Sequence, residues 1–171
     1  QIAGKYRAGL SLKYLDDYCG NNLASKSIHS FVELNRNQQT SEKDFENILR
    51  QNCPNNIDWF FDTIINSRDI VDYKFTDVSK TEDSITFTVR NKTGVVVPIP
   101  IFGLKEGKVV FKEWLQNIKG DSTITTSRND ADRIVLNYEN AVPEYNLRNN
   151  WKSLKDYSFN DRPLKFNFLK D

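Results

Sequence analysis

The first third of the chain places apolar residues at helical spacing. Tyrosine or leucine recurs every four positions from Tyr6 to Tyr18, and Gly20 follows where a helix would stop. A second apolar run covers residues 23–34. A third starts after Ser41, which forms an acidic variant of the capping box with the residues that follow it. The pattern predicts three helices in succession.

A fourth helical segment is short and dense in aromatic residues. Pro54 breaks the chain, and Asn56 then stands where it can cap the segment. The apolar residues of this segment are Ile57, Trp59, Phe60, Phe61, Ile64 and Ile65. Because they lie nearly all round the helix, we expect it to be buried on several sides, where the helical layer meets the rest of the chain.

Beyond residue 69 the apolar period becomes two. The runs predicted as strands are 71–76, 85–90, 95–104, 109–114, 122–127 and 133–138. Short alternating strands separated by polar turns are typical of an antiparallel β-sandwich. Pro98 and Pro100 favour a sheet edge or a bulge for the third run, because proline cannot donate to the ladder. Past Asn140 the period fades, and only residues 165–169 suggest one last strand.

The predicted fold class is therefore α+β. A helical layer of about four helices occupies residues 1–68, and an antiparallel β-sandwich occupies residues 69–140. Residues 141–171 form an irregular tail. The chain contains no Met and begins with Gln1, so we expect a processed product or a piece of a larger protein.

Composition narrows the candidate functions. The 171 residues include 24 Lys and Arg against 23 Asp and Glu, and no basic run, which argues against a nucleic-acid binder. No apolar stretch approaches the ~18 residues that a membrane-spanning helix needs. A catalytic zinc ion usually takes about three protein ligands, and His29 is the one histidine of the sequence. We expect no metal site and no cofactor in this chain, and His29 to lie at a helix surface or core edge.

The cysteines leave two alternatives open. Cys19 ends the first predicted helix and Cys53 ends the third. If the helices run up, down and up, these ends lie on the same side, which permits a disulfide. Two buried thiols fit the pattern equally well, since free cysteine is among the most buried residue types.

Two segments resemble the C-terminal end of the catalytic domain in zinc aminopeptidases of the aminopeptidase-N family, the gluzincins. Tyr6–Leu15, YRAGLSLKYL, is similar to the family's Y-x-K-G helix start. Ser41–Phe61, SEKDFENILRQNCPNNIDWFF, is similar to its S/T-x-x-D-F helix followed by D-W-F-F. The later segment KTEDSITFTVRNKTGVVVPIPIFGLKEG resembles the β-sandwich of a bacterial cell-envelope branch of the family. The resemblance covers residues 5–140.

The resemblance implies a role within a larger enzyme. The family's zinc ligands, H-E-x-x-H and a later Glu, precede the Y-x-K-G helix and are absent here, so zinc and the peptide substrate belong to the parent. This chain would be its non-catalytic C-terminal region, closing the cleft beside the upstream catalytic domain, with Trp59, Phe60 and Phe61 docking the sandwich. The implied location is periplasmic, extracellular or outer-membrane associated.

Tyr6 is the one residue to which the resemblance gives a catalytic role. It matches the family tyrosine whose phenolic O–H donates to the oxyanion that develops during attack on the scissile carbonyl. In this chain alone, Tyr6 simply begins the apolar stripe of the first helix. Ala8 replaces the family Lys, which puts the activity of the parent in question.

Two other functions are compatible with the sequence. The sandwich could be a stand-alone module that binds protein or glycan, with Trp114, Tyr145 and Trp151 as exposed contact residues, since aromatic residues are enriched at hot spots. Packing in the core or in loops is the alternative for all three. An independent hydrolase could use Asp16–Asp17 or Glu42–Asp44, although adjacent charges on a helix usually form its solvated face.

Overall fold

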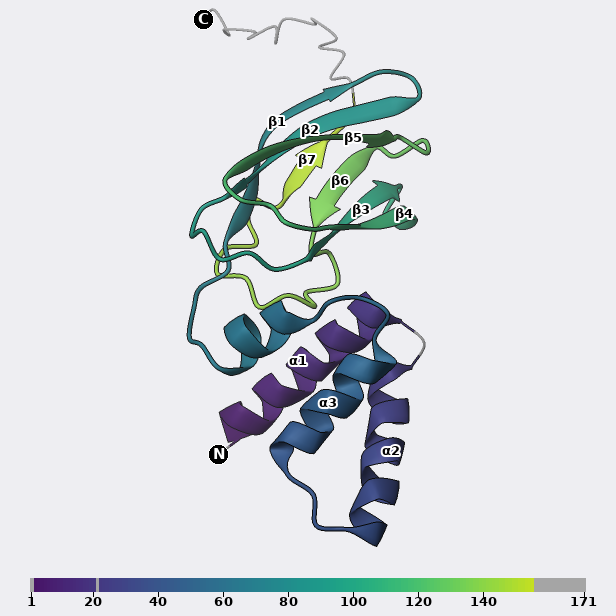
Figure 1. Ribbon diagram of the computed structural model, residues 1–171. Coiled ribbons are helices and arrows are strands. Elements are labelled where there is room, and N and C mark those ends of the chain that lie inside the picture. Colours follow the sequence, from purple (N-terminus) through teal and green to yellow (C-terminus); the bar gives the residue numbers. More distant parts are fainter. Residues whose placement is uncertain (1, 21, 156–171) are drawn as a thin grey trace, which may run out of the picture.

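The chain folds as helices first and strands afterwards (Figure 1), which confirms the predicted α+β class. The computed structural model describes residues 2–20 and 22–155, with the side chains of the first helix from Ser11 onward. The helices are α1 (Ile2–Cys19), α2 (Leu23–Asn37) and α3 (Glu42–Asn52), followed by the short η1 (Phe60–Ile65). None of the described helices is long and apolar enough to cross a bilayer.

The segment η1 differs from the predicted fourth helix in two respects. It is a π-helix, a wider coil that is rare and mostly occurs in single turns. Phe60, Phe61 and Ile64 are buried, but Ile65 is 50% exposed. The segment therefore buries one side, between the three α-helices and the sandwich (Figure 1).

Two antiparallel sheets form the second half of the molecule. One sheet has the order β1-β2-β5 and the other the order β4-β3-β6-β7. The strands are β1 (Tyr73–Lys80), β2 (Ser84–Asn91), β3 (Ile99–Lys105), β4 (Lys108–Leu115), β5 (Asp121–Ser127), β6 (Arg133–Leu136) and β7 (Trp151–Ser153). Alternation puts Ile85, Phe87 and Val89 of β2 into the core, and the threonines between them face outward.

Of the two positions predicted for the proline-containing strand, a sheet edge or a bulge, the edge is wrong, whereas the register with β4 does shift, between Gly103 and Leu104. β3 lies inside its sheet, between β4 and β6. The ladder with β6 begins at Ile101 and Leu136, and the carbonyl of Pro100 accepts one further bond from the N–H of Asn137. The N–H and C=O of a strand residue point to the same side of the strand. The N–H that Pro100 lacks would therefore point beyond the pair Ile101–Leu136, where the ladder with β6 begins.

Two further expectations need correction, and a third lies outside the described residues. Strand β7 lies beyond Asn140, where the sequence shows no apolar period and an irregular tail was predicted. It pairs with β6. The apolar face expected over residues 23–34 is only partly buried: Leu23 is buried, but Ile28 and Val32 are 50% and 44% exposed. The possible strand at 165–169 lies outside the described residues.

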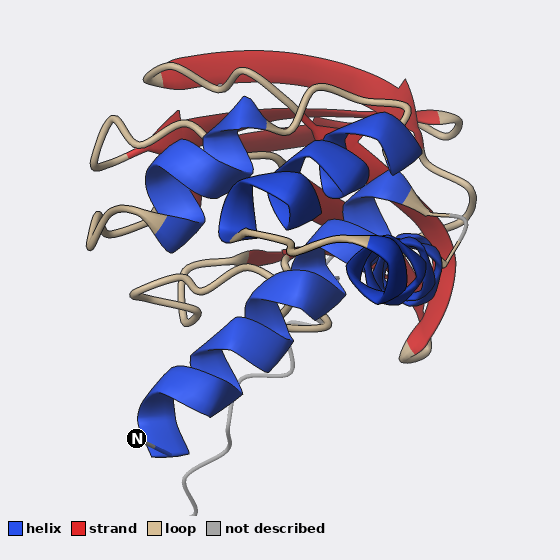
Figure 2. Cartoon of the chain, turned by 60° about the horizontal axis from the view of Figure 1, so that its bottom comes forward, coloured by secondary structure: helices blue, strands red, loops and turns tan. Residues whose placement is uncertain are grey.

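One hydrophobic core runs through both halves. Tyr14 and Leu15 of α1, Leu49 of α3 and Phe60 of η1 belong to the same buried cluster as Ile101 of β3. Figure 2 shows the helices in front of the strands, with the N-terminal part of α1 extending beyond the other helices.

Candidate functional site

Four aromatic rings join α1 to the sandwich. Tyr14 and Tyr18 of α1 contact both Trp59, just before η1, and Trp114 of β4, with ring centroids 5.0–6.0 Å apart. Such tilted, stacked and edge-on pairs contribute about 0.5–1.5 kcal/mol each beyond the area they bury. Trp114 is thus held in the junction and is not one of the exposed contact residues expected for a binding module.

Hydrogen bonds fix the same junction. The phenol of Tyr14, fully buried, donates to the carbonyl of Pro98, and burial raises its pKa well above the usual value. The N–H of Val97 donates to the phenol oxygen of Tyr73 at 3.1 Å. These bonds hold the segment before β3 against both α1 and β1.

Lys112 of β4 ties three parts of the chain together. Its Nζ contacts both carboxylate oxygens of Asp17 in α1 at 2.7 Å and Oε2 of Glu139, after β6, at 3.0 Å. It also lies 5.0 Å from the ring centre of Phe102. Burial lowers the pKa of Lys112, but its two carboxylate partners outweigh burial, so the pKa is raised.

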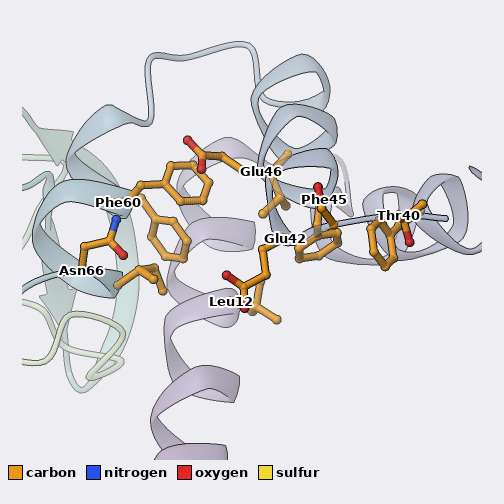
Figure 3. Close-up of a pocket in the computed structure, with 12 residues that line it drawn as sticks. Leu12, Thr40, Glu42, Phe45, Glu46, Phe60 and Asn66 are labelled. Atoms are coloured by element: carbon orange, nitrogen blue, oxygen red, sulfur yellow. The ribbon is translucent and has the colours of Figure 1, made fainter. Parts of the chain in front are cut away.

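The helical layer contains an open apolar pocket of about 600 Å³ (Figure 3). Its lining comes from α1 (Leu12), α2 (Phe31), the loop and helix around α3 (Thr40, Ser41, Glu42, Phe45, Glu46, Leu49) and the η1 region (Phe60, Phe61, Ile65, Asn66). Figure 3 shows the side chain of Glu42 near Leu12. The pocket can take bulky apolar groups.

The two carboxylates of the pocket differ in their partners. Glu46 pairs with Arg50 at 2.8 Å, and the same guanidinium bonds Asp58 and lies 4.6 Å from the ring centre of Phe61. Glu42 has no ion pair among the residues that the structure describes. Within those residues there is also no group of three or more His, Cys, Asp or Glu that could hold a metal ion.

The predicted site residues do not gather at one place. Tyr6 and Ala8 lie in the N-terminal half of α1, and their side chains are outside the described set. Trp59 belongs to the aromatic junction, whereas Phe60 and Phe61 are buried and line the pocket. A disulfide joins Cys19 at the end of α1 to Cys53 after α3, with the two Cα atoms 5.3 Å apart.

Three of the four carboxylates considered for an independent hydrolase have structural partners. Asp16 accepts from the N–H of Ala24 at 2.9 Å near the start of α2, and Asp17 pairs with Lys112. Asp44 accepts from the N–H of Ser41 at 2.8 Å, as a capping residue does. His29 is exposed on α2.

Two aromatic side chains remain accessible. Tyr145 is 78% exposed, and Trp151 is 50% exposed with the guanidinium of Arg133 5.3 Å from its ring centre. These are the two contact candidates of the binding-module hypothesis that the structure leaves at the surface.

Sequence reasoning missed Lys112 and Glu144. The partners of Lys112 lie 95 and 27 positions away, in Asp17 and Glu139. Glu144 lies in the stretch without a period, yet it bonds Tyr73, 71 positions earlier. No local pattern indicates either set of contacts, because period reports only which face of an element is buried.

No family model and no curated protein matches the sequence. Among solved structures, the fold is similar to part of an aminopeptidase A of Legionella pneumophila, determined in complex with aspartic acid. The TM-score is 0.64 at 11% identity, and the match covers 82% of this chain. The chain corresponds to 17% of the length of that protein. The chain therefore shares its fold with that part of the aminopeptidase A.

Proposed function

We propose that this chain is the non-catalytic C-terminal region of an aminopeptidase-like zinc metallopeptidase, and that it supports the rest of the enzyme. The observation that carries the proposal is the fold similarity, which spans 82% of this chain and 17% of an aminopeptidase A. The Y-x-x-G and D-W-F-F segments support the finer assignment to the aminopeptidase-N family, the gluzincins.

In this proposal the zinc ion is bound by the upstream catalytic domain, which also binds the peptide substrate. The residues of this chain then position and shield. The N-terminal half of α1, which carries Tyr6, extends beyond the other helices (Figure 2), where a preceding domain can reach it. Tyr6 would donate to the developing oxyanion, and the helical layer would form one wall of the cleft.

The aromatic junction explains how the sandwich could support that wall. Trp59 contacts both tyrosines of α1, and Phe60 and Phe61 form the buried base of η1. Docking the sandwich through these residues would keep α1 at a fixed angle to the cleft. The location of the parent enzyme is proposed to be periplasmic, extracellular or at the outer membrane.

The test compares the chain alone with the chain joined to its upstream region. Alone, with added zinc, it should not hydrolyse aminoacyl p-nitroanilides, and the joined protein should. In the joined protein, Tyr6→Phe should lower kcat by roughly 10²–10³ with little change in KM, as loss of one oxyanion donor does. Tyr145→Phe, at an exposed position, is the matched control. Turnover by the isolated chain would contradict the proposal.

A binding module for protein or glycan remains the second candidate, because Tyr145 and Trp151 are exposed large aromatics near one another in sequence. If the sandwich binds glycans, replacing both with Ala should abolish retention on a glycan array while leaving Tm unchanged. If no glycan and no peptide surface retains the wild-type chain, this second candidate is wrong.

A further inference from the structure

Glu144 joins three separate segments of the sandwich through one carboxyl group. Its Oε1 accepts from the N–H of Tyr73, the first residue of β1, at 3.1 Å. Its Oε2 lies 3.0 Å from Nδ2 of Asn137, just after β6, and 2.6 Å from Nδ2 of Asn150, just before β7. We call residues 137–150 the clasp segment.

This cluster contains more buried acceptors than donors. Among the described residues, the buried side-chain oxygens without a hydrogen-bond partner are Asp72 Oδ1, Asn149 Oδ1 and Asn150 Oδ1. Asp72 precedes Tyr73, a partner of Glu144, and Asn150 is itself a partner of Glu144. Two of the unpaired oxygens therefore belong to residues that lie next to this carboxyl group or bind it. Buried polar atoms without a partner are rare and costly, and one added proton would supply a donor.

We propose that Glu144 is a proton-dependent clasp: it carries a proton in the folded protein and loosens the clasp segment when it ionises. The nearby charges favour this state. Asp72 is 4% exposed and pairs with Lys92, so this cation already has a carboxylate partner. The phenols of Tyr73 and Tyr14 are the other titratable groups coupled to Glu144, and neither supplies a positive charge.

The electrostatics of the carboxyl agree with this geometry. Burial raises the pKa of Glu144 to about 7, and the neighbouring charge of Asp72 adds to the increase. The hydrogen bonds from Tyr73, Asn137 and Asn150 oppose the shift without cancelling it. Between the ordinary value of 4.5 and about 7, the carboxyl is therefore ionised in the unfolded chain and protonated in the folded one.

Loosening the clasp segment would reach the helical layer. Glu139, within the segment, shares Lys112 with Asp17 of α1. The segment also buries Ala141 and Val142 in the common core. A rise in pH through neutrality would thus weaken the contact between sandwich and helices.

The direct test follows the carboxyl carbon of Glu144 by ¹³C NMR during a pH titration of the folded chain. We expect its resonance to move near pH 7. Glu82, in the exposed turn between β1 and β2, is the control position. A titration midpoint of Glu144 at or below pH 4.5 would overturn the proposal. This measurement uses the wild-type chain and does not depend on the folding of a variant.

The second test replaces the carboxyl with a neutral amide of the same shape. The Tm of the wild type should fall as the pH rises from about 4.5 to about 7, because the raised pKa stabilises the fold only below that range. Glu144→Gln should remove this fall, whereas Glu82→Gln should retain it. Above pH 7, hydrogen exchange of the Tyr73 and clasp-segment amides should be faster in the wild type than in Glu144→Gln.

Two results would contradict the clasp. The first is a Tm of the wild type that rises relative to that of Glu144→Gln as the pH increases from 4.5 to 7, because this rise would indicate an ionised carboxylate in the folded state. A rise in wild-type Tm on adding Ca²⁺ at pH 8, absent in Glu144→Gln, would indicate that a cation and not a proton satisfies these oxygens.

Discussion

Gly103 is the residue at which the sandwich allows no side chain. It lies opposite Phe111 in the register of β3 and β4, and the phenyl ring covers it. A Cβ at this position would lie 2.0 Å from Cε1 of Phe111, closer than any real contact. Glycine is therefore required here by space, because the aromatic ring occupies the place of a side chain.

We predict that Gly103→Ala lowers the free energy of unfolding by about 1–3 kcal/mol, since Phe111 must leave its position. Chemical denaturation of the two proteins measures the difference. Gly9→Ala is the control: nothing lies within 4 Å of its Cβ, and alanine in a helix is stabilising by about 0.5–1 kcal/mol. Equal stability of Gly103→Ala and the wild type would show that the ring moves freely.

At the scale of elements, the disulfide organises the helical layer. Cys19 and Cys53 connect the end of α1 to the end of α3 across a separation of 34 residues. Burial of both cysteines beside Leu23 and Leu49 places the link in the core. The link therefore fixes the helices on either side of α2, whose exposed Ile28 and Val32 give it a smaller share of the packing.

We predict that removing this disulfide costs about 4 kcal/mol, from the entropy of the loop it closes in the unfolded chain. The double variant Cys19→Ala/Cys53→Ala should melt at the same temperature as the wild type treated with a reductant, and well below the oxidised wild type. A reductant that leaves the Tm of the wild type unchanged would contradict this expectation.

Element order could be predicted from the sequence, but the position of each strand in its sheet could not. The change of apolar period near residue 69 separates helices from strands because each period reflects one buried face. Pro98 and Pro100 suggested an edge or a bulge. β3 is nevertheless internal, because Pro100 lies beyond the last residue pair of the ladder with β6. Strand β7 has only three residues, too few for alternation to show.

At the scale of the whole molecule, helices and sandwich share their interior. The buried cluster is continuous from Tyr14 in α1 to Leu136 in β6, and Tyr14, Tyr18 and Lys112 cross the boundary between the halves. Neither half encloses its apolar face without the other. Cooperativity of unfolding follows from such a shared core.

We predict that the two halves unfold in a single transition. Far-ultraviolet circular dichroism reports mainly the helices, and tryptophan fluorescence reports Trp59 and Trp114 at the junction and Trp151 in β7. The two melting curves should coincide on heating under oxidising conditions. Two transitions separated by more than a few degrees would show that the halves are independent units.

The sequence by itself determined the elements of this protein: helices and then strands, the capped third helix, and the lack of a histidine set for zinc. These properties follow from neighbours along the chain, through apolar period, capping and composition. Only the tertiary structure decided which residues meet: Lys112 with Asp17 and Glu139, and Glu144 with Tyr73, Asn137 and Asn150. The pKa values of Lys112 and Glu144 depend on burial by segments that are far apart in the sequence, and no local pattern encodes that burial.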